Sequence, residues 1–168
     1  MKIFTIIGYT DSGKTSTLIK MIEELVKRGF VVNTVKKVHI ENFTVETEGK
    51  DSWLHRQAGA TITVTRSNCE TAIMFQRPLA LKELIPFFSC DYLILEGFTK
   101  EPQVPKILCA KSDDEIDDRF DKSVFAISGV ISNKLSHFKG VEVINGLKET
   151  KRLVDLAMEK AIDGKELL

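Results

Sequence analysis

The sequence has few cysteines, and none of them stands in a recognisable pairing pattern. Only three occur in 168 residues, Cys69, Cys90 and Cys109, with no C-x-x-C pair among them. The number is odd and the spacing wide, which does not indicate a disulfide framework. Each cysteine lies in or beside an apolar segment, so we expect buried free thiols in a reduced, cytoplasmic protein.

Charge of one sign and long apolar runs are also missing. Lys and Arg total 24, as do Asp and Glu, so the formal net charge is zero. No strong whole-chain field therefore draws the protein toward nucleic acid or an anionic membrane. No apolar run approaches the roughly 18 residues needed to cross a bilayer, and the N-terminus shows no signal-peptide pattern. We expect neither nucleic acid nor a membrane as a partner.

The sequence does contain a complete phosphate-binding loop. The motif G-x-x-x-x-G-K-[ST] occupies residues 8–15. Before it, residues 2–7 form a β-branched, apolar run that predicts a buried parallel strand. After it, apolar residues recur at helical spacing and predict a helix that ends at Lys27-Arg28-Gly29. This strand–loop–helix context supports the motif as a nucleoside triphosphate site.

Each part of the loop has an expected role. Gly8 and Gly13 let the backbone turn its N–H groups inward toward a phosphate, and the helix start adds its own N–H groups. Lys14 is expected to reach the β- and γ-phosphates, where it would act catalytically by stabilising phosphoryl charge. The predicted nucleotide-binding residues of the loop are Gly8, Thr10, Asp11, Ser12, Gly13, Lys14, Thr15 and Ser16.

The predicted fold is α/β and P-loop NTPase-like, with a mainly parallel sheet flanked by helices. A strand at residues 30–35 completes a right-handed βαβ unit with the first strand and helix. Residues 61–65 and 71–75 read as two strands that could pair as a hairpin. Residues 79–88 predict a helix that Pro86 kinks or stops near Ile85. We expect a single nucleotide-binding domain over residues 1–168.

The second half of the chain predicts further strands and a final helix. Strands are expected at residues 91–97, 105–110, 124–129 and 141–144. The acid-rich segment 112–122 lacks the spacing of a calcium loop and is interpreted as a solvated loop or frayed turn. Asn145 is expected to cap a last helix whose apolar stripe begins at Leu147 and belongs to the core.

A magnesium site is predicted from Thr15 and Glu96. The hydroxyl of Thr15 is the loop's expected ligand for Mg²⁺. Glu96 closes a run of apolar residues that reads as a buried central strand. A carboxylate at the carboxyl end of such a strand is where phosphate-loop proteins hold Mg²⁺, usually through water. Asp91 lies at the other end of the same strand.

The polar segment 36–50 is expected to form a functional loop beside the nucleotide. Lys36, His39 and Lys50, with Arg66 further on, could form a surface for an anionic ligand such as a phosphorylated pterin. Asp51, at the start of a short helix through Ala58 capped by Asp51 or Ser52, is the best candidate for a catalytic residue that positions water. His39 and His55 fit anion contact or plain surface positions better than metal ligation.

One segment resembles a guanine-reading motif. Asn133-Lys134-Leu135-Ser136 is similar to the N-K-x-D motif of G proteins, except that Ser136 replaces the aspartate. Without that carboxylate, the bidentate bond to the guanine edge is absent. The sequence therefore leaves GTP and ATP both open as the bound nucleotide.

Four further motifs follow the phosphate loop in an order that resembles the molybdopterin-guanine dinucleotide biosynthesis protein B (MobB) family. They are Lys36-Lys37-Val38-His39, Gly49-Lys50-Asp51-Ser52 with Ala58-Gly59-Ala60, Leu95-Glu96-Gly97-Phe98 and Pro105-Lys106-Ile107. The resemblance covers roughly residues 1–133. It implies a P-loop fold, usually dimeric, that binds GTP with Mg²⁺ and hydrolyses it weakly at most. Its implied partners are molybdopterin and the guanylyltransferase that joins GMP to it.

The chain departs from that family's pattern in the basic loop. The family often has K-H-x-H-H-D, whereas Lys37 replaces the first histidine and Ile40 the second. Glu41 and Glu46 stand where the family often has aspartate. Any pterin or anion contact made by those histidines is altered here.

Three other functions remain open from the sequence. The chain could be an ATP-dependent small-molecule kinase or ligase with a phosphate loop. It could be a metallochaperone-like GTPase for nickel, although it has no His-rich tract and no paired Cys and His ligands. It could also be a nucleotide-free adaptor, which would leave the complete phosphate loop without a role.

Overall fold

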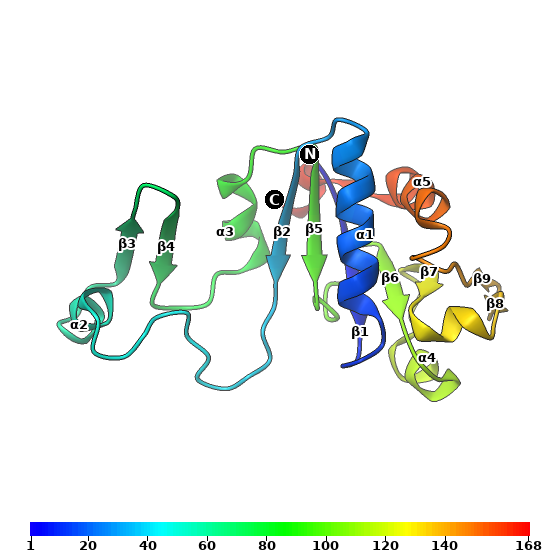
Figure 1. The fold of residues 1–168 in the computed structure, drawn as a ribbon, viewed down its shortest axis with the longest axis horizontal. Coiled ribbons are helices and arrows are strands. Elements are labelled where there is room, and N and C mark those ends of the chain that lie inside the picture. Colours follow the sequence, from blue (N-terminus) through cyan, green and yellow to red (C-terminus); the bar gives the residue numbers. More distant parts are fainter. The chain divides into compact units, whose positions relative to one another are not determined.

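The computed structural model describes all 168 residues, which divide into two compact units. The first unit contains Met1–Lys37 and Phe87–Leu168, and the second contains Val38–Pro86. The phosphate loop and the main sheet belong to the first unit (Figure 1). The expectation of one nucleotide-binding domain over the whole chain stays a prediction. None of the helices has the length and apolar character that a membrane crossing requires.

The first unit is built on a mainly parallel sheet, as the sequence predicts. Its five parallel strands follow the spatial order β2-β5-β1-β6-β7. A sixth strand, β10, pairs antiparallel with β1 and was not predicted, because two residues carry no readable periodicity. The strands are β1 (Lys2–Gly8), β2 (Val32–Lys36), β5 (Tyr92–Glu96), β6 (Lys106–Cys109), β7 (Val124–Ser128) and β10 (Ile162–Asp163).

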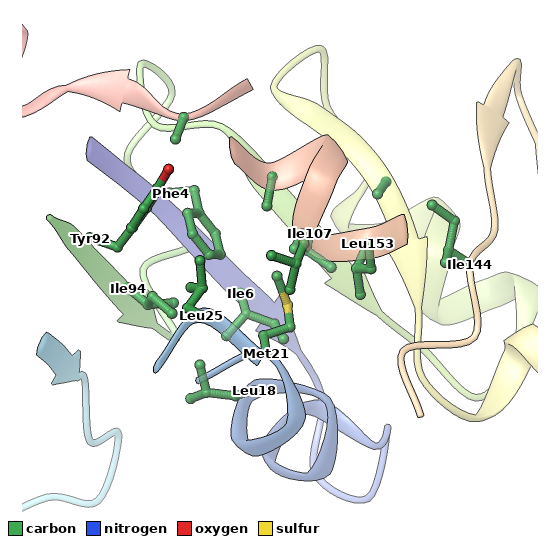
Figure 2. Close-up of a cluster of buried hydrophobic side chains, with 14 of the residues drawn as sticks. Phe4, Ile6, Leu18, Met21, Leu25, Tyr92, Ile94, Ile107, Ile144 and Leu153 are labelled. Atoms are coloured by element: carbon green, nitrogen blue, oxygen red, sulfur yellow. The ribbon is translucent and has the colours of Figure 1, made fainter. Parts of the chain in front are cut away.

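Two long helices cover one face of this sheet. α1 (Lys14–Lys27) and α5 (Thr150–Lys160) pack against each other and against alternate residues of the central strands. Figure 2 shows Met21 and Leu25 of α1 in the same cluster as Phe4 of β1. Full burial of one such side chain is worth about 1.5–3 kcal/mol, so the cluster fixes the helix that carries the loop's lysine.

The acid-rich segment is a helix, which corrects the prediction of a solvated loop. α4 spans Asp113–Arg119 and buries Ile116 in a second apolar cluster on the other side of the sheet. Ser112 is its N-cap and accepts a hydrogen bond from the Glu115 N–H at 3.4 Å. Acidic residues in the first turn face the positive end of the helix dipole. The acidic side chains therefore stabilise the helix start instead of marking a solvated loop.

The region after β7 also differs from the sequence expectation. The strand predicted at 141–144 is shorter: β9 (Val141–Glu142) pairs with β8 (His137–Phe138), and Val143 makes an isolated parallel bridge to Ile127. α5 begins at Thr150, later than a cap at Asn145 would give, and Leu147 is exposed instead of in the core.

The second unit contains the predicted hairpin. β3 (Ile62–Arg66) and β4 (Thr71–Phe75) pair antiparallel, which confirms that prediction. α3 (Leu81–Leu84) gives way to a 3-10 turn at Ile85–Phe87, so the helix stops early at the proline as expected. α2 (Asp51–Gln57) is present, but Lys50 is its N-cap residue and makes no side-chain cap, so a cap by Asp51 or Ser52 is wrong.

The cysteines differ from one another in burial. Cys109, on β6, is fully buried as expected. Cys90 is only partly buried, and Cys69 lies exposed in the hairpin turn, so the expectation of three buried thiols is wrong for these two. A cysteine beside an apolar residue in the sequence is not necessarily buried, because a two-stranded hairpin leaves one face open to solvent.

Candidate functional site: the phosphate loop and its surroundings

The phosphate loop leaves the sheet where three strands end side by side. Gly8 of β1 is paired in register with Cys109 of β6, which is paired with Ser128 of β7. All three strands are parallel, so these residues share the carboxyl edge of the sheet. In open α/β sheets, ligands bind outside this edge.

The loop fits its neighbours closely at both glycines. A Cβ on Gly8 would lie 2.3 Å from the Cys109 carbonyl oxygen, so only glycine allows this approach. Gly13 has φ 86° and caps α1 in the left-handed conformation. Between them, the Ser12 hydroxyl donates to the Tyr9 carbonyl at 2.8 Å and closes the turn. Asp11 also adopts positive φ (60°), which costs a non-glycine residue about 1–2 kcal/mol.

The concave side of the loop presents unpaired backbone donors. Thr17 donates its N–H to the Gly13 carbonyl at 3.0 Å, which begins the helical ladder. The N–H groups of Lys14, Thr15 and Ser16 precede that ladder and have no acceptor within the chain. Together with the positive end of the α1 dipole, they make a site suited to a phosphate.

A turn after β7 supports the loop from one side. The Val130 N–H donates to the Ser12 carbonyl at 3.1 Å. Gly129, with φ 86°, lies so close that a Cβ there would stand 2.1 Å from the same carbonyl oxygen. This contact joins two segments far apart in the sequence and was not predicted, because a lone glycine after a strand has no specific sequence signal.

α4 also supports the loop. The Tyr9 hydroxyl donates to the Asp118 carboxylate, and the Arg119 guanidinium lies 3.8 Å from the centre of the Tyr9 ring. Lys111, just before the helix, reaches the Thr10 carbonyl at 3.5 Å. The contacts of Asp118 and Arg119 were not predicted, because residues 112–122 were expected to form a solvated loop or frayed turn, and the contact of Lys111 has no sequence signal.

Glu96 lies between two lysines beside the loop. Its side chain is 9% exposed, at the carboxyl end of β5. The ammonium groups of Lys14 and Lys36 are each 3.8 Å from Glu96 Oε1. Three predicted site residues from the loop, β2 and β5 thus meet at one point. Two cations and one carboxylate leave net positive charge next to the unpaired N–H groups.

The remaining predicted residues lie elsewhere in the fold. His39 is exposed in the segment between β2 and α2, Lys50 and Asp51 begin α2, and Arg66 ends β3. All four belong to the second unit, so their roles at the nucleotide stay predictions. Within that unit, Arg56 pairs with the buried Glu46 at 3.1 Å and lines a pocket of about 470 Å³.

Comparison with known proteins gives consistent matches. A family model described as "MobB: Molybdopterin guanine dinucleotide synthesis protein B" matches residues 3–133. The molybdopterin-guanine dinucleotide biosynthesis adapter protein of Haemophilus influenzae is 38% identical over 113 residues, which are 64% of this chain and 62% of that protein. The adapter protein of Escherichia coli K12 is 31% identical over 108 residues, 60% of this chain and 61% of that protein.

Solved structures agree on the fold. The crystal structure of Bacillus subtilis MobB superposes with a TM-score of 0.79 at 23% identity, covering 96% of this chain and 99% of that one. The chain matches about three fifths of the length of the two adapter proteins. The family model covers well over half of the chain, including the phosphate loop, β5 and β6. The chain belongs to the MobB family.

Proposed function

We propose that this protein binds GTP with Mg²⁺ and acts as an accessory protein in molybdenum cofactor biosynthesis. It would assist a guanylyltransferase that attaches GMP to molybdopterin, giving the guanine dinucleotide form of the cofactor. The observation that carries nucleotide binding is the row of unpaired N–H groups at Lys14, Thr15 and Ser16, beside the Lys14–Glu96 contact. The names of the two adapter proteins support the pathway.

The residues present fit both a triphosphate and Mg²⁺. The loop offers donors and a lysine for phosphate oxygens, and Gly8 and Gly13 allow the close packing that holds the loop in this shape. Thr15 and Glu96 would hold the metal, because a hydroxyl and a carboxylate are oxygen ligands of the kind that Mg²⁺ prefers. When bound, Mg²⁺ would supply charge that offsets the phosphate oxygens.

We propose slow GTP hydrolysis because the side chains near Lys14 are already engaged in other contacts. Tyr9 is engaged by α4 and Ser12 by its own loop, so neither is free to orient an attacking water. The Glu96 carboxylate contacts two lysines instead. Asp51 remains the proposed water-positioning residue. We therefore propose at most a weak GTPase, with a homodimer in the cytoplasm as its working form.

Calorimetry with GTP and ATP, each with and without Mg²⁺, tests the proposal. We expect Mg²⁺-dependent binding with GTP preferred, and loss of binding in Lys14→Ala. Lys20→Ala, on the exposed face of the same helix, is the matched control and should bind as the unaltered protein does. Preference for ATP, with ADP released only when a second substrate is present, would instead support a kinase or ligase.

The proposed pterin contact of Lys50 needs a separate test. Charge reversal at Lys50, which has no ion-pair partner, should weaken binding of a phosphorylated pterin and spare GTP. Reversal at Lys36 should affect both ligands, since Lys36 also contacts Glu96. Unchanged pterin binding in Lys50→Glu would remove Lys50 from the proposed pterin surface.

A further inference from the structure

We propose that two asparagines, Asn133 and Asn145, read the nucleobase through its N7 and O6 edge and leave the 2-amino group of guanine unread. The inference rests on the proposed function, because it concerns the base of a nucleotide held by the phosphate loop. It goes further by predicting that hypoxanthine is accepted as readily as guanine.

Both asparagines stand at the carboxyl edge of the sheet. Asn133 ends the 3-10 turn Val130–Asn133 that follows β7. Asn145 follows Ile144, whose N–H donates to the Ile127 carbonyl of β7 at 2.8 Å. The Asn145 side chain donates from Nδ2 to Asn133 Oδ1 at 3.1 Å. Two turns distant in sequence are thereby joined by their amide side chains.

Each of these turns touches the phosphate loop or its helix. The first turn does so through the bond from the Val130 N–H to the Ser12 carbonyl. The second packs on Thr17 of α1, because a Cβ on Gly146 would lie 2.6 Å from Thr17 Cγ2. Buried Ser128 accepts from the Gly146 N–H at 3.2 Å and fixes this turn. A ligand with phosphates in the loop could thus reach the two asparagines with its base.

The asparagines have hydrogen-bond donors to spare. Asn133 Nδ2 donates one hydrogen to the Val130 carbonyl at 3.1 Å, and Asn145 Nδ2 donates one to Asn133. An amide nitrogen carries two hydrogens, so each keeps one N–H free. Asn145 Oδ1 is used within its own turn, where it accepts from the N–H groups of Leu147 and Lys148 at 3.1 Å. Asn133 Oδ1 accepts one hydrogen bond, from Asn145, and keeps one lone pair, so the two free N–H groups outnumber the free acceptor site.

No free carboxylate flanks Asn145 in the chain. Glu142 and Glu149, the acidic residues on either side of it in sequence, are both paired with Arg152. Ser136 stands where a G-protein motif would carry an aspartate. A free carboxylate that would bind the N1–H and 2-amino group of guanine is thus missing from these turns.

Each turn also exposes one apolar side chain that the core does not use. Val130 is 43% exposed and Leu147 is 56% exposed. A purine is flat and apolar on its faces, so it suits such a position better than a second charged group would. The two exposed apolar side chains therefore suit a purine base.

The donor pattern distinguishes between purines. Guanine and hypoxanthine both present acceptors at N7 and O6, whereas adenine presents an acceptor at N7 and a donor at N6. A site in which free donors outnumber free acceptors should favour guanine and hypoxanthine over adenine. The two favoured bases differ only in the 2-amino group, which this site does not contact.

The test measures the affinities of GTP, ITP, ATP and base-free tripolyphosphate, all with Mg²⁺, by calorimetry. We expect GTP and ITP within about threefold of each other and ATP weaker by about tenfold or more. Asn145→Asp keeps the oxygen that the turn needs but removes the donor. It should weaken GTP and ITP about tenfold more than it weakens tripolyphosphate, whose own loss of affinity measures the effect of the added charge.

Asn133→Ala should act in the same direction, and Asn68→Asp, in the turn of the β3–β4 hairpin, is the matched control. GTP binding tenfold tighter than ITP would overturn the inference, because the 2-amino group would then be read. Unchanged GTP affinity in both variants would overturn it while leaving the proposed function standing. If the unaltered protein bound neither nucleotide nor tripolyphosphate, both would fail together.

Discussion

The Lys14 ammonium lies 3.8 Å from the Glu96 carboxylate, between the start of α1 and the end of β5. The same oxygen is equally far from Lys36. Without a ligand, the carboxylate thus partly neutralises two cations that face the phosphate loop. In the proposed function, a bound metal would compete with both lysines for Glu96, and this residue would then couple nucleotide binding to metal binding.

Replacing Glu96 by glutamine should have opposite effects with and without metal. Affinity for GTP without Mg²⁺ should rise, because a negative charge next to the phosphates is removed and Lys14 is released. The Mg²⁺ concentration needed for half-maximal enhancement of GTP binding should rise about tenfold, since the proposed Mg²⁺ ligand Glu96 is lost. Titration of Mg²⁺ at fixed GTP measures both. Glu101→Gln, in the loop after β5, is the control, and an unaltered Mg²⁺ response in Glu96→Gln would contradict the assignment.

Gly129→Ala should disturb the phosphate loop from the neighbouring turn. The added Cβ would stand 2.1 Å from the Ser12 carbonyl oxygen, at φ 86°. Gly29 has nearly the same φ (89°), but a Cβ added there would meet no atom within 4 Å. Gly29→Ala therefore measures the free-energy cost of the backbone conformation without a clash. We expect about 1–2 kcal/mol for Gly29→Ala and at least about 2 kcal/mol more for Gly129→Ala in urea unfolding. Equal costs would mean that the turn moves away from the loop freely.

The pair of Lys106 and Asp121 should make stability depend on acid pH. Lys106 is fully buried and donates to Asp121 at 2.8 Å. Burial alone would raise the pKa of Asp121, but hydrogen bonds from Lys106 and Ser123 outweigh it and hold the pKa below the ordinary value. A lowered carboxyl pKa contributes stability that is present above about pH 4 and is lost as pH falls through the folded value.

Single substitutions in this pair distinguish the contributions of Lys106 and Asp121 to stability. Asp121→Ala should cost about 3 kcal/mol at neutral pH, because it leaves the buried ammonium with Ser123 as its remaining partner. Lys106→Met should cost less, since it removes the buried charge itself. Urea unfolding at pH 7 and pH 3 measures both effects. A smaller cost for Asp121→Ala than for Lys106→Met would contradict this account.

Thiol alkylation should follow the burial of the three cysteines. Burial raises the pKa of the Cys109 thiol to about 12, so it carries almost no thiolate at pH 8 and is closed to reagents. Exposed Cys69 should react within minutes with iodoacetamide, and half-buried Cys90 more slowly. Mass spectrometry of peptides from native and urea-unfolded protein determines the order in which the three cysteines are alkylated. Early labelling of Cys109 in native protein would show that β6 opens.

Much of this protein could be predicted from local sequence. The phosphate loop, the strand before it and the helix after it follow from glycine positions and apolar periodicity, which act over a few residues. The hairpin and the early end of α3 at Pro86 follow from similar local rules. The prediction of a loop for the acidic run was wrong, because it gave more weight to charge composition than to two local signals for a helix. These signals are the serine N-cap and Ile116, which is buried.

The sequence alone therefore determined a phosphate-binding loop between a strand and a helix in an α/β protein of the MobB pattern. The tertiary structure alone decided what surrounds that loop. Glu96 and Lys36 reach Lys14 because β5 and β2 are adjacent in the sheet, and Asn145 reaches Asn133 because Val143 bridges to β7. Such contacts depend on strand order and register, which backbone hydrogen bonds between distant segments set and which leave no periodic signal along the chain.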